Sequence, residues 1–414
     1  MVSKDKTTIT FHSGILTIGG TVIEVAYKDS HIFFDFGTEF LPKLELTDES
    51  VQTLVDHRVI PHLKNIYDAR IPYKYEGDED KDYANTAVFI SHAHLDHTRM
   101  LNYLDPNIPL YTLKETKMIV NSLNRNGVFL LPSPFEDESF TRNMIGLDAG
   151  DVIKVGEIEV EIVRVDHDAY GAAALIIKTP GHHITYTGDL RLHGHNAEDT
   201  IEFCKKAKHT DILMMEGVSI SFGDRSVEAE AFKPETEEDV IRQIIFLEKE
   251  NPHRQLTFNG YPANVRRFEK IVEGTSRIVV LEATMAALLK EVFQKEAHYY
   301  YREGAPRLDE LNPYLEISYE TLLEDTTEYL WQVVDHFERL QEGSLYLHSD
   351  AQPLGDFDPN YQPFLDLLAK KNIEFVRLAC SGHAKPEDLD RIIAMIEPKC
   401  LIPIHTLKPE LLEN

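Results

Sequence analysis

The sequence predicts an α/β protein of two domains, one rich in strands and one built from alternating strands and helices. Three observations predict this class. Short apolar runs fill the first half, strand-like and helix-like segments alternate from about residue 217 to 372, and the last segment reads as strand, loop, helix, strand. With 414 residues the chain also exceeds one ordinary domain, so two are expected.

The strands of the first half are predicted from runs that end at turn residues. "TITFHSG" and "TVIEVAY" flank Gly19-Gly20, which suits a tight hairpin turn, and "HIFFDFG" follows as a third run. "TAVFIS" reads as a buried strand, and "TLKETKMIVNSLNRNG" has helical spacing with Gly127 as its stop. "DVIKVGEIEVEIVRVDH" and "GAAALIIKTPGHHITYTGD" then predict two strand hairpins.

The middle of the chain alternates between two periodicities. Helices are expected in "ETEEDVIRQIIFLEKE", "NVRRFEKIVEG", "DTTEYLWQVVDHFERLQEG" and "YQPFLDLLAKKN". Strands are expected in "RQLTFN", "RIVVLE" and "SLYLHS". This pattern predicts a parallel sheet with crossover helices. We expect 325–343 to be the best-defined amphipathic helix of the set.

Composition favours a cytoplasmic globular protein. No run reaches the ~18–20 apolar residues of a membrane span, and the N-terminal segment lacks the apolar core of a secretory signal. Three cysteines without Cys-x-x-Cys spacing make a disulfide framework or a thiolate zinc site unexpected. The net charge of −28 argues against non-specific coating of nucleic acid. It does not exclude a nuclease, because bound cations dominate the field of a local cleft.

The segment "SHAHLDH" carries the strongest functional signal. His92 and His94 are two residues apart, so they point the same way on an extended chain. If a helix or turn begins at Asp96, then Asp96 and His97 face a second point nearby. Imidazole and carboxylate are ligands for zinc or manganese, and paired cations ~3.5–4 Å apart serve phosphoester hydrolysis. A solvated helix start capped by Asp96 is the alternative, and the rarity of the full pattern favours a metal.

Four further polar residues stand at the exits of apolar runs. They are Asp35, His167, Asp189 and His405. Each one alone is explained by a turn or by a hydrogen-bonded histidine. Together they form a convergent set if their strands share one edge of a sandwich.

In this order, Asp35, "HAHLDH", His167, Asp189 and His405 resemble the five motifs of the metallo-β-lactamase fold. The resemblance implies an αββα sandwich. It also implies a ligand set: His92, His94 and His167 for one cation, Asp96, His97 and His405 for the other, and Asp189 between the two. Asp35 would support the ligands from behind.

The C-terminal segment resembles one particular branch of this fold. "CSGHAKPEDL" and "IEPKCLIPIHT" are similar to the end of the β-CASP nucleases, the branch that contains ribonuclease J and the polyadenylation-factor endonuclease. In that branch a second domain is inserted before the last metal histidine. The implied domains are therefore 1–216, an inserted β-CASP-like domain at 217–372, and a return at 373–414. The extra motifs of the branch fall on Glu216, His383 and His405.

The resemblance implies a two-metal ribonuclease that cleaves single-stranded RNA with a metal-activated hydroxide. The expected catalytic residues are Asp96, Asp189, Glu216 and His383; His383 would stabilise the transition state or protonate the leaving oxygen. The expected cofactors are two divalent cations, Zn²⁺ first and Mn²⁺ second. Substrate contacts are suggested at Ser381, Asn264 and Arg267.

Three alternatives remain open at this point. The first is a hydrolase of a small ester, thioester or lactone on the same scaffold, and the second is a DNA-directed nuclease. The third is an RNA-binding protein without catalysis, which the complete ligand set disfavours. The expected partner is RNA rather than a membrane, and the oligomeric state is left open between a monomer and a homodimer.

Overall fold

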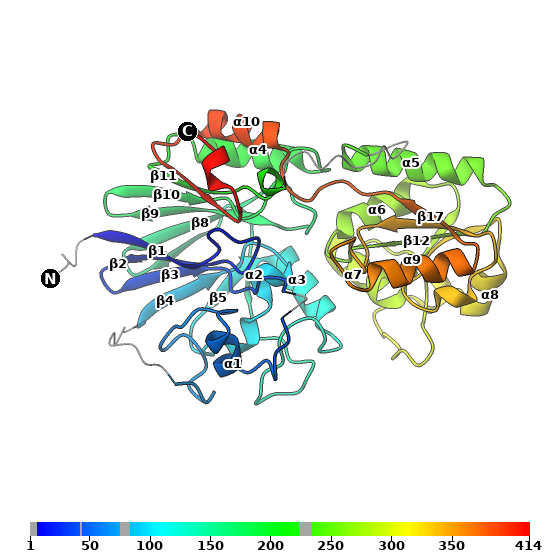
Figure 1. Ribbon diagram of the computed structural model, residues 1–414, viewed down its shortest axis with the longest axis horizontal. Coiled ribbons are helices and arrows are strands. Elements are labelled where there is room, and N and C mark those ends of the chain that lie inside the picture. The colour runs from blue at the N-terminus through cyan, green and yellow to red at the C-terminus, as the bar shows by residue number, and fades with distance from the viewer. Residues whose placement is uncertain (1–5, 42–43, 75–82, 223–233) are drawn as a thin grey trace. The chain divides into compact units, whose positions relative to one another are not determined.

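The computed structural model describes residues 6–41, 44–74, 83–222 and 234–414 (Figure 1). The chain divides into two compact units. Unit 1 comprises residues 1–225 and 382–414, and unit 2 comprises residues 226–381. The predicted boundaries at 216 and 372 lie on the N-terminal side of these divisions, and the assignment of functional domains stays a prediction.

Unit 1 contains two six-stranded sheets. The first is built, in spatial order, from β1 (Thr7–Ser13), β2 (Val22–Tyr27), β3 (Ser30–Phe34), β4 (Asn85–Phe89), β5 (Leu110–Leu113) and β6 (Ile145–Leu147). The first two strands pair antiparallel, as predicted, but residues 14–21 connect them. The expected tight turn at Gly19-Gly20 was therefore wrong, because these glycines lie inside a longer loop.

The second sheet of unit 1 has a different strand order. It is built from β18 (Leu401–Ile404), β11 (Ile212–Glu216), β10 (His182–Tyr186), β9 (Ala173–Thr179), β8 (Ile158–Arg164) and β7 (Val152–Val155). The two predicted hairpins are confirmed, since β8 pairs antiparallel with β7, and β9 with β10. The last strand, β18, pairs parallel with β11 and so brings the C-terminal segment back into this sheet.

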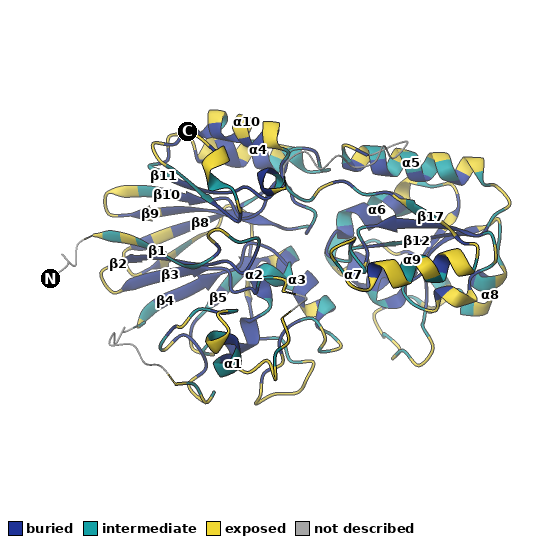
Figure 2. Cartoon of the chain, in the orientation of Figure 1, coloured by how far each residue is buried: buried dark blue, intermediate teal, exposed yellow. Residues whose placement is uncertain are grey.

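The core of unit 1 lies between its two sheets. Phe34 and Phe89 of the first sheet pack with Tyr186 and Met214 of the second, and all four are buried. On the outer face of the second sheet, a further cluster includes Phe203 and residues of the C-terminal helix. Figure 2 shows buried strands and helices whose outward faces are exposed. The fold class predicted from the sequence, an αββα sandwich with an inserted βα part, is confirmed.

The helices of unit 1 are short and border the sandwich. They are α1 (Val51–Asp56), α2 (Leu95–Thr98), α3 (Lys114–Leu123), α4 (Ala197–Lys206) and α10 (Pro386–Ile396), with 3₁₀ turns η1 (Leu101–Tyr103), η2 (Ser219–Ser221) and η5 (Pro409–Leu411). The predicted helix at 112–127 is confirmed in α3, which begins two residues later and ends at Leu123.

Unit 2 is a separate parallel sheet with connecting helices. Its spatial order is β14 (His298–Tyr300), β13 (Ile278–Glu282), β15 (Tyr329–Gln332), β12 (Leu256–Gly260), β16 (Leu345–Ser349) and β17 (Glu374–Arg377). Every neighbouring pair is parallel, as the alternating pattern predicted. The strand β17, which the prediction placed in the C-terminal return, pairs with β16 and so belongs to this sheet.

The helices of unit 2 begin mostly where the sequence predicts. They are α5 (Glu237–Glu250), α6 (Val265–Gly274), α7 (Ala283–Phe293), α8 (Tyr319–Glu324) and α9 (Tyr361–Lys370), with turns η3 (Pro313–Leu315) and η4 (Phe337–Arg339). A capping box between Thr236 and Asp239 fixes the start of α5. The helix expected at 325–343 was wrong, because this segment forms β15 and the turn η4.

A buried histidine stands near the carboxyl end of β16 in unit 2. His348 contacts Phe375, with ring centroids 5.3 Å apart, and its Nδ1 lies 3.0 Å from the hydroxyl of Tyr346. Burial, followed by the positive charge of Arg377, lowers the pKa of His348 to about 4. The unfolded chain therefore takes up this proton at a higher pH than the folded chain does.

This difference predicts a loss of stability in acid. The contribution of neutral His348 is fully present above pH 6.5 and is lost as the pH falls toward 4. Between pH 7 and pH 4.5 the native chain should lose about 2 to 3 kcal/mol more than His348→Gln does. Trp331 is the single tryptophan of the chain and is buried in unit 2, so its fluorescence during urea unfolding reports this unit. Parallel pH curves for the two proteins would contradict the prediction.

Candidate metal centre

The polar residues at the strand exits of unit 1 meet at one edge of the sandwich. Asp35 follows β3, the segment 90–98 follows β4, and His167 follows β8. Asp189 follows β10, and His405 follows β18. The strands β3 and β4 pair parallel, and β8 and β10 both pair antiparallel with β9, so their carboxyl ends lie together.

Backbone hydrogen bonds hold the histidine-rich segment in place. The N–H of Phe36 donates to the carbonyl of His97 (2.9 Å), and the N–H of Gly20 donates to the carbonyl of Asp96 (3.1 Å). The segment begins as extended chain and turns into α2 at Leu95, as the spacing of the histidines predicted. Gly37 passes so close that a Cβ atom there would lie 1.8 Å from the carbonyl carbon of Asp96.

Because the backbones of Gly37 and Asp96 lie so close together, we expect Gly37→Ala to disrupt the site. The methyl group would have to push α2 and the carbonyl of Asp96 away, which we expect to destabilise unit 1 by roughly 3 kcal/mol. Thermal unfolding of the variant measures this loss. Gly355→Ala is the control for a glycine-to-alanine change, since its φ is not positive and the nearest atom would lie 3.6 Å from its Cβ. Equal unfolding temperatures for the two variants would contradict the prediction.

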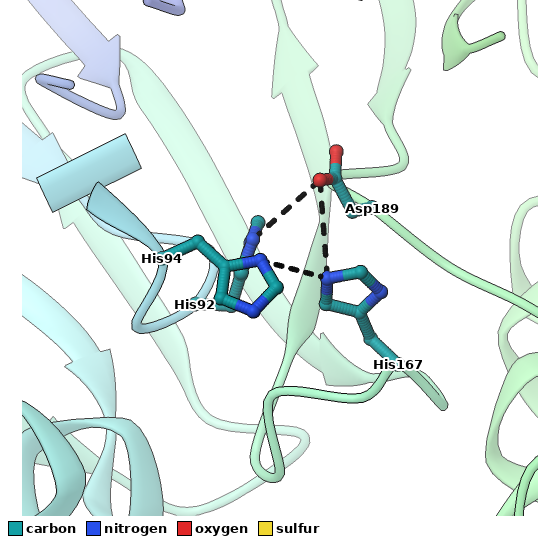
Figure 3. A group of neighbouring side chains, drawn as sticks. All are labelled: His92, His94, His167 and Asp189. Atoms are coloured by element: carbon teal, nitrogen blue, oxygen red, sulfur yellow. Dashed lines mark hydrogen bonds and ion pairs between the residues drawn. The ribbon is translucent and has the colours of Figure 1, made fainter. Parts of the chain in front are cut away.

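The first group of donors comprises His92, His94, His167 and Asp189, whose ligand atoms lie within 4.8 Å of one another (Figure 3). Nδ1 of His94 lies 3.2 Å from Nε2 of His167. The Oδ2 atom of Asp189 lies 3.5 Å from Nε2 of His92 and 3.9 Å from Nε2 of His167. These side chains come from one strand exit of the first sheet, after β4, and from two of the second sheet, after β8 and β10, and they point toward one centre.

The second group comprises Asp96, His97, Asp189 and His405, again within 4.8 Å of one another. Nε2 of His97 lies 3.4 Å from Oδ2 of both Asp96 and Asp189. Nε2 of His405 lies 3.5 Å from the same two oxygens. Asp189 thus belongs to both groups, through one oxygen atom that lies between them.

Supporting contacts fix the rings from behind. Asp35 accepts hydrogen bonds from Nδ1 of His97 (2.8 Å), from the hydroxyl and N–H of Ser91 (2.9 and 2.7 Å) and from the hydroxyl of Tyr186. Nδ1 of His167 donates to the carbonyl of Gly382 (2.6 Å). Such partners orient an imidazole and leave its other nitrogen toward the metal. The sequence suggested the place of Asp35, whereas Ser91 and Tyr186 gave no signal.

The donor set fits divalent cations. Nε2 of His92, Nε2 of His97 and Oδ2 of Asp189 are buried and make no hydrogen bond within the described residues. Buried polar atoms are costly unless paired. Burial would raise the pKa of Asp189, but the neighbouring imidazoles of His405 and His97 lower it well below its ordinary value. Burial lowers the pKa of His92, which leaves this ring in the neutral form that binds metals.

Glu216 and His383 lie beside the donor groups. Nδ1 of His383 is 3.2 Å from Oε1 of Glu216 and 3.8 Å from Oδ2 of Asp189. Glu216 is fully buried and also accepts the N–H of Val218 (3.0 Å). Burial opposes the charge on His383, but the carboxylate of Glu216 outweighs it and raises the pKa of His383 to about 10. The ring is thus held as a proton carrier at the rim of the site.

The three suggested substrate contacts are placed differently. Arg267 is buried and makes two hydrogen bonds of 2.8 Å with Glu237, and the side chain of Asn264 both caps α6 and donates to Glu237. These contacts give both residues a structural role within unit 2, and their role as substrate contacts stays a prediction. Ser381 is exposed and directly precedes Gly382. Its role stays a prediction.

Sequence reasoning also missed an acidic residue beside the first donor group. Asp168 directly follows His167, and its Oδ1 lies 3.1 Å from Nε2 of His167 and 3.4 Å from Nε2 of His94. The position after a metal histidine carries no periodic or motif signal, so only the folded chain reveals the carboxylate beside the first donor group.

Comparison with known proteins agrees with this geometry. Residues 76–222 match the family model described as a β-lactamase superfamily domain. The chain has a ribonuclease J-like metallo-β-lactamase fold, and these similarities support a metal-dependent hydrolase. Within the described residues, no helix has the length and apolar character that crossing a membrane requires.

The chain is similar in sequence to several proteins named ribonuclease J. Ribonuclease J of Mycoplasma genitalium is 20% identical over 98% of this chain and 68% of its own length. Ribonuclease J of Pyrococcus abyssi is 21% identical over 77% and 74%, and that of Helicobacter pylori is 22% identical over 97% and 56%. The chain thus spans little more than half of the Helicobacter enzyme. A crystal structure of a protein of unknown function from Enterococcus faecalis is 70% identical, covers 99% of this chain and 96% of its own, and has a TM-score of 0.96.

Proposed function

We propose that this protein is a two-metal phosphodiesterase that cleaves single-stranded RNA. The observation that carries the proposal is a pair of donor groups that share the buried Oδ2 of Asp189, with the His383–Glu216 pair 3.8 Å from that oxygen. Paired cations with a carboxylate between them suit in-line displacement at phosphorus. The names of the ribonuclease J relatives support RNA as the substrate.

The residues of the two donor groups would have different roles in the reaction. His92, His94 and His167 would hold one cation, and Asp96, His97 and His405 the other, with Asp189 shared. When bound, these cations supply charge neutralisation at the phosphate and activation of water. Asp96 and Asp189 are the carboxylates of the two donor groups, and they would keep the attacking water deprotonated.

His383 is the proposed general acid. It lies at the rim of the site, and Glu216 both orients its ring and keeps it protonated. An alkoxide that leaves from phosphorus needs a proton, and a positioned acid of this kind contributes ~10²–10⁴-fold in rate. The burial of Glu216 excludes water from this hydrogen bond and so strengthens it.

We infer Zn²⁺ as the first choice for the cations, because the first donor group offers three imidazoles and a carboxylate and the second offers two of each, and both kinds of group are common zinc ligands. Mn²⁺ is the second choice. The inserted unit is the proposed β-CASP-like domain, and its boundaries are proposed from the sequence at 217–372. The cytoplasmic location and the oligomeric state stay predictions.

One experiment tests the function directly. The purified chain, loaded with Zn²⁺ or Mn²⁺, is incubated with one single-stranded RNA labelled separately at each end, with and without a chelator. The proposal expects cleavage that the chelator stops and that added metal restores, and the two labels distinguish internal from terminal cleavage. Metal-loaded protein that shortens no RNA at any concentration would overturn it. Turnover of a chromogenic ester or of single-stranded DNA alone would favour the corresponding alternative.

A further inference from the structure

Asp168 is an acidic residue beside the first donor group that the proposed mechanism does not use. Its Oδ1 lies 3.1 Å from Nε2 of His167, which is the nitrogen that faces the centre of the group. The same oxygen lies 3.4 Å from Nε2 of His94. The side chain is 15% exposed, so the carboxylate is largely removed from water.

The Oδ1 atom of Asp168 shares a property with the donors of the metal centre. It is buried and makes no hydrogen bond within the described residues, as is true of Nε2 of His92 and Oδ2 of Asp189. A buried carboxylate oxygen without a partner costs free energy unless a cation or a donor satisfies it. A cation bound by Nε2 of His92 and Oδ2 of Asp189 would also satisfy Oδ1 of Asp168.

The backbone of Gly382 keeps the carboxylate of Asp168 in this position. Gly382 passes so close that a Cβ atom there would lie 2.5 Å from Oδ1 of Asp168. The carbonyl of Gly382 also accepts the hydrogen bond from Nδ1 of His167. The glycine of the "SGHA" motif therefore positions two adjacent side chains, His167 and Asp168, against the same donor group.

We propose that Asp168 supplies an additional oxygen ligand to the first cation and thereby raises the affinity of this site for Mn²⁺ relative to Zn²⁺. The inference rests on the metal centre of the proposed function and not on RNA as its substrate. Three imidazoles and one carboxylate complete a tetrahedral zinc site. A second carboxylate raises both the oxygen share and the number of ligands, which suits Mn²⁺ better than Zn²⁺.

Metal affinity tests this inference without any activity measurement. Apo-protein is titrated with Mn²⁺, followed by its electron paramagnetic resonance signal, and with Zn²⁺ against a chromophoric chelator. Both titrations are repeated in the His405→Ala background, where the second donor group lacks one imidazole. In Asp168→Ala, the Kd for Mn²⁺ at the first site should rise ~10–100-fold. The Kd for Zn²⁺ should rise about threefold or less, since its tetrahedral set stays complete.

Two further variants separate charge from position. Gly382→Ala keeps the charge of Asp168 but displaces its oxygen, so it should weaken Mn²⁺ more than Zn²⁺ as well. Asp148→Asn removes one negative charge from an exposed residue of the same unit that pairs with Lys114, and it should leave both Kd values unchanged. If Asp168→Ala does not fold, Gly382→Ala and Asp168→Asn carry the test.

Two results would overturn the inference. Equal weakening of Mn²⁺ and Zn²⁺ in Asp168→Ala, with Asp168→Asn restoring both, would mean that the residue only orients His94. Unchanged affinities for both cations in Asp168→Ala would mean that the carboxylate does not contact the metal at all. A failure to cleave RNA would contradict the proposed function but would leave this inference standing, since its readout is metal binding.

Discussion

Asp189→Ala is expected to lose both cations and more than about 10³-fold of the RNA-cleaving rate. Asp189 is the one residue common to both donor groups, and its Oδ2 lies between them. Removing it leaves each group one ligand short and takes away one of the two carboxylates that lie beside His97 and His405. The charge stabilisation supplied by bound cations is worth several kcal/mol, and about 4 kcal/mol corresponds to ~10³-fold in rate.

The measurement pairs metal content with kcat. Metal per chain is determined by mass spectrometry after dialysis, and the rate is measured on the same preparation. Asp148→Ala is the matched control, because that carboxylate is 70% exposed and pairs with Lys114. A variant at Asp189 that retains two cations and native cleavage would contradict the shared role.

His383→Ala has the second-largest expected effect. We expect ~10²–10⁴-fold slower RNA cleavage with the metal content unchanged, because His383 donates a proton but is not a member of either donor group. Glu216→Gln should give a smaller loss of the same kind. The amide can still contact the ring, but it no longer holds the ring protonated, and the effective pKa of His383 should fall.

The leaving group distinguishes an acid from a merely structural residue. Bis(p-nitrophenyl) phosphate releases a stable phenolate that needs little protonation. His383→Ala should therefore slow this substrate far less than it slows RNA, whereas Asp189→Ala should slow both substrates alike. Equal losses on RNA and on the nitrophenyl substrate in His383→Ala would mean that the histidine does not protonate the leaving oxygen.

The sequence predicted that these polar residues converge, because part of the signal is local. Two histidines two residues apart after a strand, with Asp96 and His97 following, constrain both the backbone and the chemistry. The remaining donors each follow an apolar strand, and strands that share a sheet edge bring such residues together. The roles of these residues as ligands stay predictions until a cation is observed.

Some elements of the fold were not predicted correctly from the sequence. The main error concerns a strand that is buried on both faces. The segment 325–343 shows apolar residues at helical spacing, yet Leu330, Trp331 and Val333 are buried around the central strand β15. A strand covered on both faces carries apolar residues on both sides, so its pattern does not separate it from a helix. The helices α7 and α8 were also not predicted.

Supporting residues of the site were beyond sequence reasoning for a different reason. Asp168 and Tyr186 matter through contacts with residues distant in the chain, such as His94 and Asp35. No spacing within one sequence encodes such contacts. In the same way, no sequence signal indicated that Arg267 is buried and hydrogen-bonded to Glu237.

Anomalous diffraction from crystals of the metal-loaded protein tests the central claim most directly. We expect two peaks that flank Oδ2 of Asp189, one among His92, His94 and His167 and the other among Asp96, His97 and His405. A single peak outside these groups, or saturating metal with no peak at Asp189, would contradict the proposed centre and the chemistry assigned to it.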